Sequence, residues 1–184
     1  MATPPLSPTL WRTCRVLSGR VRLDLLRRVI LRPGLNVSEL AKEAGVGISD
    51  ASQELRRIQS RGLIRRTSRG PAIVYTPVSD PLVPSAAPLL RVLKYLWPTE
   101  RSDDPHIERI AKGLASERRV ALVRILSKQP ASMEELSGRL RTAPSNLTRH
   151  LVILRQTGWI YREGRSYRLK PPTHPLQAAL LDML

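Results

Sequence analysis

The stretch LSGRVRLDLLRRVILRPGLNVSELAKEAGVGISDASQELRRIQSRGLIRR (residues 17–66) recurs in altered form as LASERRVALVRILSKQPASMEELSGRLRTAPSNLTRHLVILRQTGWIYR (residues 114–162). One deleted residue, opposite Leu35, brings the two stretches into register. Identical residues then face each other at Leu17 and Leu114, Arg22 and Arg119, Leu25 and Leu122, Arg27 and Arg124, Pro33 and Pro130, Glu39 and Glu135, Leu40 and Leu136, Ser49 and Ser145, Leu55 and Leu151, Gly62 and Gly158, Ile64 and Ile160, and Arg66 and Arg162. A period of roughly 97 residues makes each copy long enough to be a domain.

Each copy predicts two short helices joined by a tight turn, which is the helix–turn–helix pattern. The first of these helices has a start signal in both copies, since Asn36 and Ser132 are N-capping residues with a Glu three places on. Gly45 and Arg141 occupy the turn, and a left-handed conformation there would cost Arg141 about 1 kcal/mol. Apolar residues at helical spacing predict the buried faces, which are Leu40, Ala44, Ala51, Leu55 and Ile58 in the first copy and Met133, Leu136, Leu140, Leu147, Leu151 and Leu154 in the second.

A β-hairpin is predicted after each pair of helices. Gly62 and Gly158 are placed to end the helices as left-handed caps. The following runs, LIRRTSRGPAIVYTP (63–77) and WIYREGRSYRLKP (159–171), each have two β-rich segments around a polar turn that contains Gly. The expected fold class is therefore mainly α with small β-hairpin wings, as two tandem winged helix–turn–helix domains.

Apolar helices are also predicted at the start and the end of each copy. Their stripes are Leu10, Cys14 and Leu17, then Leu89, Val92, Leu93 and Leu96, in the first copy, and Ile107, Ile110, Ala111 and Leu114, then Leu176, Leu180 and Leu184, in the second. Exposed apolar surface of this extent needs a cover. We expect these terminal helices to pack together as an intramolecular pseudo-dimer. The expected domains are 1–97 and 106–184, joined by a linker at 98–105, with residues 1–8 as an irregular arm.

The net charge of +16 points to a polyanionic partner, most often nucleic acid. Both parts carry the surplus, with 16 basic and 6 acidic side chains in residues 1–98 and 15 and 9 in residues 99–184. A basic surface kept only for solubility is the alternative. The chain has no Phe and only 4% aromatic residues, which argues against a base-stacking groove for single strands.

Cys14 is the only cysteine, so no intrachain disulfide can form, which fits a cytoplasmic, nucleoid-associated protein. Its place in an apolar helical stripe makes it a small core residue rather than a reactive thiol. We expect no membrane span and no export signal.

The stretch APSNLTRHLVILRQTGWIYREGRSYRL (143–169), preceded by LASERRVALVRIL (114–126), resembles the ArsR-type winged-helix regulators. The family phrase S-R-H-L-x-x-L-x-x-x-G-L-V is matched by Thr148, Arg149, His150, Leu151, Leu154, Gly158, Trp159 and Ile160. The resemblance covers about 70 residues of the second half well and the first half more loosely. It implies a DNA-binding regulator with dimer contacts through terminal helices.

Metal-sensing members of that family place a pair of cysteines in the third helix. The corresponding stretches here, NVSELAKEAG (36–45) and SMEELSGRL (132–140), contain neither Cys nor His. His106, His150 and His174 lie far apart in the sequence without ligand spacing. We therefore expect no metal site and no cofactor.

A recognition helix turns one face to the core and the other to the major groove. In the second copy the outward residues include Asn146, suited to adenine, and Arg149, suited to guanine. The alternative is that Ser145 caps the helix and Arg149 contacts only phosphate. The predicted DNA-contacting residues of this copy are Ser145, Asn146, Thr148, Arg149, Arg155, Arg162 and Arg165.

The first copy has different chemistry on its outward face, because Asp50 and Glu54 replace Asn146 and His150. Glu54 is spaced to pair with Arg57. Either this copy reads a different half-site, or it binds weakly through its wing. Its predicted DNA-contacting residues are Ser49, Ser52, Gln53, Arg56, Arg57, Arg65, Arg66 and Arg69.

The sequence favours a sequence-specific regulator of transcription that binds double-stranded DNA as a monomeric pseudo-dimer or a homodimer. Two alternatives stay open. One is an architectural DNA binder with little base readout; the other is a tandem winged-helix scaffold for protein interactions. An enzyme is not expected, because the chain lacks a Gly-rich phosphate loop, a GxSxG elbow and a Cys–His arrangement.

Overall fold

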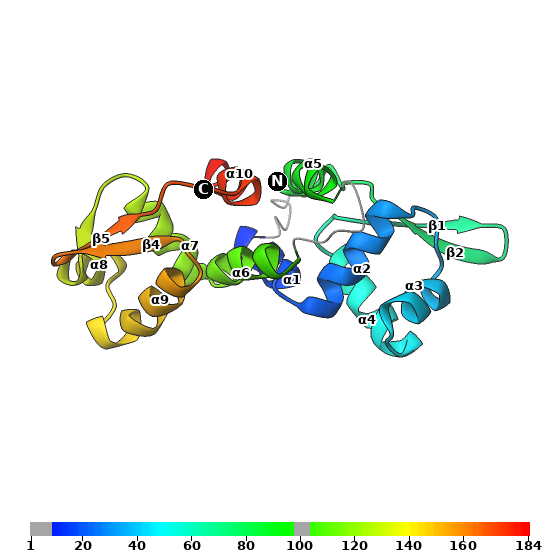
Figure 1. Cartoon of the computed structure of the whole chain (residues 1–184), viewed down its shortest axis with the longest axis horizontal. Coiled ribbons are helices and arrows are strands. Elements are labelled where there is room, and N and C mark those ends of the chain that lie inside the picture. The colour runs from blue at the N-terminus through cyan, green and yellow to red at the C-terminus, as the bar shows by residue number, and fades with distance from the viewer. Residues whose placement is uncertain (1–8, 98–103) are drawn as a thin grey trace, which may run out of the picture.

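The computed structural model describes residues 9–97 and 104–184 (Figure 1). The irregular arm predicted at residues 1–8 and residues 98–103 of the predicted linker lie outside the described part of the chain. The elements up to residue 97 are α1 (Leu10–Leu17), α2 (Arg20–Leu31), α3 (Val37–Ala44), α4 (Ile48–Gln59), β1 (Arg65–Arg69), β2 (Ala72–Thr76) and α5 (Ala86–Leu96). The elements after it are α6 (Asp104–Leu114), α7 (Glu117–Leu126), β3 (Ala131–Ser132), α8 (Met133–Leu140), α9 (Pro144–Gln156), β4 (Ile160–Glu163), β5 (Ser166–Leu169) and α10 (Pro175–Asp182). Apart from β3, the second series has the same order as the first.

The turn between the two helices of each helix–turn–helix is built in the same way in both series. Full capping boxes start α3 at Asn36 and α8 at Ser132, as predicted from their spacing. Gly45 ends α3 in the left-handed region, and Arg141 ends α8 there too, with φ 47° and ψ 49°. Arg141 therefore holds a conformation that costs a side chain about 1 kcal/mol.

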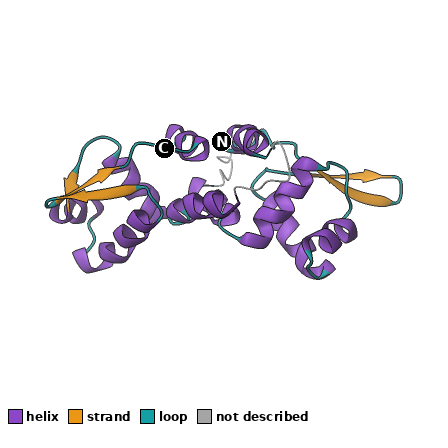
Figure 2. Cartoon of the chain, in the orientation of Figure 1, coloured by secondary structure: helices purple, strands orange, loops and turns teal. Residues whose placement is uncertain are grey.

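The predicted hairpins are present as β1–β2 and β4–β5, coloured as strands in Figure 2. The sequence did not predict β3, which pairs antiparallel with β5 through Ala131 and Ser132. A strand of two residues is too short to show the alternation by which strands are detected. In the first series an isolated bridge from Asn36 to Val74 stands in the matching place.

Helices from the two series pack on each other, α1 against α6 and α5 against α10. The apolar positions predicted for α1, α4, α6 and α9 are largely buried and belong to one continuous core. The prediction for α3 and α8 was wrong in part: Ala44, Met133 and Leu140 are only half-buried, while Ala41 lies fully in the core. These positions lie near the ends of short helices, where the face turned to the core is narrow.

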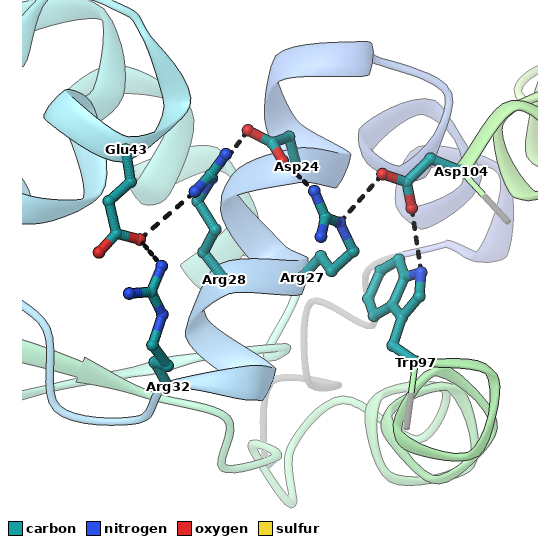
Figure 3. Close-up of polar contacts among 7 residues, drawn as sticks. All are labelled: Asp24, Arg27, Arg28, Arg32, Glu43, Trp97 and Asp104. Carbon is teal, nitrogen blue, oxygen red and sulfur yellow. Dashed lines mark hydrogen bonds and ion pairs between the residues drawn. The ribbon is translucent and has the colours of Figure 1, made fainter. Parts of the chain in front are cut away.

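The linker was predicted to run to residue 105, but α6 already begins at Asp104. Asp104 accepts hydrogen bonds from Arg27 Nε at 3.1 Å and from Trp97 Nε1 at 3.0 Å. It thus joins α6 to α2 and to the end of α5, and it continues a network (Figure 3) whose members are Asp24, Arg27, Arg28, Arg32, Glu43, Trp97 and Asp104. An acidic side chain in the first turn and a proline at position 105 both suit a helix start, so Asp104 and Pro105 are helical.

Candidate nucleic-acid interface

Helix α9 presents an apolar face to the core and a polar face to solvent. Leu147, Leu151 and Leu154 are buried on the inner side. The outer side consists of exposed residues: Ser145, Asn146, Thr148, Arg149, Val152 and Arg155. The division follows from the i, i+4, i+7 spacing of the leucines, and it places the predicted contact residues of this helix together on one surface.

The beginning of α9 lacks a side-chain cap. Ala143 is the N-cap residue, without a side-chain hydrogen bond, and Pro144 follows. The alternative in which Ser145 caps the helix was wrong, because Ser145 lies inside the first turn. Pro144 has no N–H and the Asn146 N–H donates to the Ala143 carbonyl at 3.0 Å, so it is mainly the helix dipole that favours a phosphate at this end. Thr148 donates its hydroxyl to the Pro144 carbonyl at 3.2 Å, so its oxygen faces outward mainly as an acceptor.

Positive charges from α7 and α9 gather around His150 of α9. Arg119 donates to the carbonyls of Gly113 and Lys112 at 2.8 and 3.0 Å, and Arg118 donates to Thr142 Oγ1 at 3.5 Å. Burial, followed by the positive charges of Arg119, Arg118 and Arg149, holds the pKa of His150 below its ordinary value. The sequence prediction missed Arg118, whose exposed side chain belongs to α7 and reaches the turn before α9. Its adjacency could not be read from residue spacing alone.

The wing of this series has both bound and available arginines. Arg162 donates to the Gly164 carbonyl at 3.0 Å, and Arg168 pairs with Glu163. Arg165 is exposed at the hairpin tip. Arg155 and Arg162 line one surface recess between α9 and the wing, together with Lys170, which the prediction had left out of the contact set.

Helix α4 presents a different surface. Ser49, Gln53, Arg56 and Arg57 are exposed, whereas Ser52 is half-buried. Glu54 pairs with Arg57 at 2.6 Å, as the spacing predicted, and also with Arg22 at 2.9 Å. The carboxylate neutralises part of the charge that this helix would offer to a phosphate backbone.

All five residues of β1 are exposed, so the guanidinium groups of Arg65, Arg66 and Arg69 are accessible. Because side chains alternate along a strand, Arg65 and Arg69 share one face of the hairpin and Arg66 lies on the other. A wing with arginines on both faces can contact backbone phosphates or a minor groove.

Figure 1 shows α4 and α9 on the same side of the elongated molecule, with α5 and α10 along the opposite side. The two hairpins lie toward the two ends (Figure 2). The predicted contact residues of each series therefore gather on one helix and one wing.

Comparison with known proteins finds a match to a family of regulators within the second series. Residues 116–162, from the residue before α7 into β4, match the family described as "Bacterial regulatory protein, arsR family". These residues form an ArsR-family helix–turn–helix domain. A curated relative, the "HTH-type transcriptional regulator LrpA" of Mycobacterium tuberculosis (strain ATCC 25618 / H37Rv), is 28% identical over 144 residues, which cover 72% of this chain and 90% of LrpA. Both findings support a DNA-binding regulator.

Within the described residues, no group of three or more His, Cys, Asp or Glu side chains could hold a metal ion. The rings of His106 and His174, distant in sequence, lie 4.7 Å apart, and His174 Nδ1 accepts from the Leu176 N–H. Burial raises the pKa of the Cys14 thiol to about 12, which keeps it protonated.

No described helix is long and apolar enough to cross a bilayer.

Proposed function

We propose that this protein is a sequence-specific regulator of transcription that reads double-stranded DNA with α9 of its ArsR-family domain. The observation that carries the proposal is the outer face of α9. Asn146 and Arg149 have amide and guanidinium groups that can make bidentate bonds to adenine and guanine. The uncapped helix start and the arginines of the wing would position the helix on the phosphate backbone.

We further propose that the chain is a pseudo-dimer of two winged-helix domains. The contacts of α1 with α6 and of α5 with α10 support this, since they join matching helices. Arg22 and Arg119 also occupy matching places, because each donates Nε to the carbonyl six residues earlier, at 3.0 and 2.8 Å. In this arrangement α4 and α9 would enter major grooves on one face of the duplex, about 34 Å apart.

The two helices would read unlike half-sites. The outer face of α9 contains amide, hydroxyl and guanidinium groups, whereas α4 carries the exposed Asp50 and a Glu54 bound to two arginines. A carboxylate in the major groove accepts from cytosine but repels phosphate. The preferred site should accordingly be asymmetric or an imperfect palindrome, with α9 supplying most of the base readout.

Selection of bound sequences from random duplex DNA, followed by binding measurements on the selected site, tests the proposal. Asn146→Ala and Arg149→Ala should each reduce specific affinity by about 1–3 kcal/mol and relax the base preference at one position. Arg91→Ala is the matched control, since Arg91 is exposed on α5, on the opposite side of the molecule from α9. If no sequence is enriched, or if the control weakens binding equally, α9 is not the reading helix.

The exposed arginines of β1 favour a second candidate, an architectural DNA binder with little base readout. The two candidates differ in competition assays, because a specific binder should prefer its site over unrelated duplex by about 10³-fold or more. In either case we propose a binding protein and not an enzyme.

A further inference from the structure

A strongly basic pocket lies where α1 meets the C-terminal end of α4. Its volume is about 310 Å³. The lining residues are Trp11, Arg12, Arg15, Val16, Arg22, Arg57, Ser60 and Arg61. Five of these eight residues are arginines and none is acidic, so the pocket concentrates positive charge beside a small apolar wall.

Two of the five arginines share one carboxylate, and the other three, Arg12, Arg15 and Arg61, have no ion pair among the described residues. The guanidinium carbons of Arg12 and Arg15 each lie 5.1 Å from the centroid of the half-buried Trp11 ring, which is cation–π distance. Burial, and then the charge of Arg12, lowers the pKa of Arg61. Among the described residues, Glu54 is the only carboxylate found paired in this cluster, and it bonds to Arg22 and Arg57. Arg12, Arg15 and Arg61 thus keep donors available for an added anion.

The second series has a pocket in the matching place, where α6 meets the end of α9. In the register of the repeat, Glu108 replaces Trp11, Lys112 replaces Arg15, and Ile153 and Thr157 replace Arg57 and Arg61. The same backbone frame therefore exists without the tryptophan and with an acidic group in its lining. The fold does not require the arginine cluster, so the cluster needs another explanation.

We propose that the pocket between α1 and α4 binds a small molecule that carries phosphate groups. Planar guanidinium groups match phosphate oxygens bidentately, and several of them converging favours a polyanion over a single carboxylate. The volume lies at the lower end of the range of small-molecule sites. Trp11, Val16 and the aliphatic stems of the arginines offer an apolar surface for the rest of the ligand.

The position of the pocket gives its ligand a route to DNA binding, a consequence that rests on the proposed function. Arg57, Ser60 and Arg61 belong to the last turn of α4 and the residues just after it. An anion bonded to Arg22 and Arg57 competes with Glu54, which lies on α4 itself. Ligand binding would therefore alter the charge on the outer face of α4 and change affinity for the α4 half-site.

Calorimetric titration of the full chain with inorganic pyrophosphate, at about 0.15 M salt to screen surface charge, tests the site without DNA. The test variant is Arg12→Gln with Arg15→Gln, and the matched control is Arg109→Gln with Lys112→Gln at the corresponding exposed positions of α6. We expect saturable binding with a dissociation constant below about 1 mM. The test variant should weaken it at least about tenfold per lost charged hydrogen bond, and the control should leave it unchanged.

Fluorescence provides a second readout, because Trp97 and Trp159 are fully buried whereas Trp11 is partly exposed. Pyrophosphate should change the Trp11 emission and protect it from iodide quenching, and a melting curve will show that the test variant is folded. Absent binding, or equal losses in the test and control variants, would overturn the site.

Binding of duplex DNA, measured in parallel, distinguishes a failure of this site from a failure of the proposed function. If the test variant lost affinity for duplex DNA while the wild-type chain failed to bind pyrophosphate, the arginines would belong to backbone recognition and the proposal would be wrong. If pyrophosphate bound while no DNA sequence was selected, the pocket would stand and the proposed function would fall.

Discussion

Gly113 and Trp159 form a size-matched pair whose disruption should destabilise the fold. The Trp159 ring is fully buried and donates Nε1–H to the Ile110 carbonyl at 2.9 Å. A Cβ added at Gly113 would lie 2.7 Å from Thr157 Oγ1 and closer still to Trp159 Cδ1 and Nε1. We therefore predict that Gly113→Ala drives the indole out of its place.

The magnitude follows from three contributions. Alanine gains about 1 kcal/mol of helix propensity over glycine. Overpacking a filled core costs about 1–3 kcal/mol, and a lost buried hydrogen bond costs a further 1–3 kcal/mol or so. The net loss should be about 3 kcal/mol, or roughly 6–12 °C in Tm for a chain of this length.

Urea unfolding followed by circular dichroism measures this loss, with Gly138→Ala as the control. Gly138 is also helical, but nothing lies within 4 Å of an added Cβ, so this variant should gain about 0.5–1 kcal/mol. Should both alanine variants prove equally stable, the packing argument would be refuted.

The first series suggests a double substitution that restores the packing. In the register of the repeat, Val16 and Leu63 correspond to Gly113 and Trp159. We predict that Gly113→Val combined with Trp159→Leu destabilises the chain by at least about 2 kcal/mol less than the sum of the single substitutions. Additivity within about 0.5 kcal/mol would contradict the proposed correspondence between the two series.

Three further predictions concern stability. Arg141→Gly should raise the free energy of unfolding by about 1 kcal/mol, because glycine adopts the left-handed region without strain; a lower melting temperature would contradict this. Asp104→Ala should lower that free energy by about 1–2 kcal/mol, because it leaves Arg27 Nε and the Trp97 indole N–H without an acceptor while Arg27 keeps its pair with Asp24, whereas the exposed Asp182→Ala should have little effect in the same urea titration. Because the pKa of His150 is below 6.5 in the folded chain, the unfolded chain takes up more protons as the pH falls below about 6.5, and stability should fall with it. His150→Gln should reduce this loss between about pH 7.5 and pH 5.5, and an unchanged pH dependence would refute the assignment.

Local signals in the sequence were sufficient to predict most of the helix–turn–helix and both hairpins. Asn36 and Ser132 indicate helix starts because they cap the helices through short-range hydrogen bonds, and the spacing of the leucines alone indicates the buried face of α9. These features depend on residues within a few positions of one another, so one sequence contains the information.

Features that depend on the meeting of distant segments could not be predicted in this way. The ion pair of Arg27 with Asp104, the approach of Arg118 to Thr142 and the pocket of Trp11 with Arg61 each join residues far apart in the chain. Only one of the two ion pairs of Glu54 could be predicted, because Arg57 lies on the same helix and Arg22 does not.

Guanine methylation protection on a selected duplex site tests the central claim most directly, since the N7 atoms it reports lie in the major groove. The proposed pseudo-dimer predicts two protected patches on one face of the DNA, about 10–10.5 base pairs apart, of which Arg149→Ala removes one and Arg56→Ala weakens the other. A single protected patch, or two patches that respond equally to Arg149→Ala, would contradict a chain that places α4 and α9 in successive major grooves.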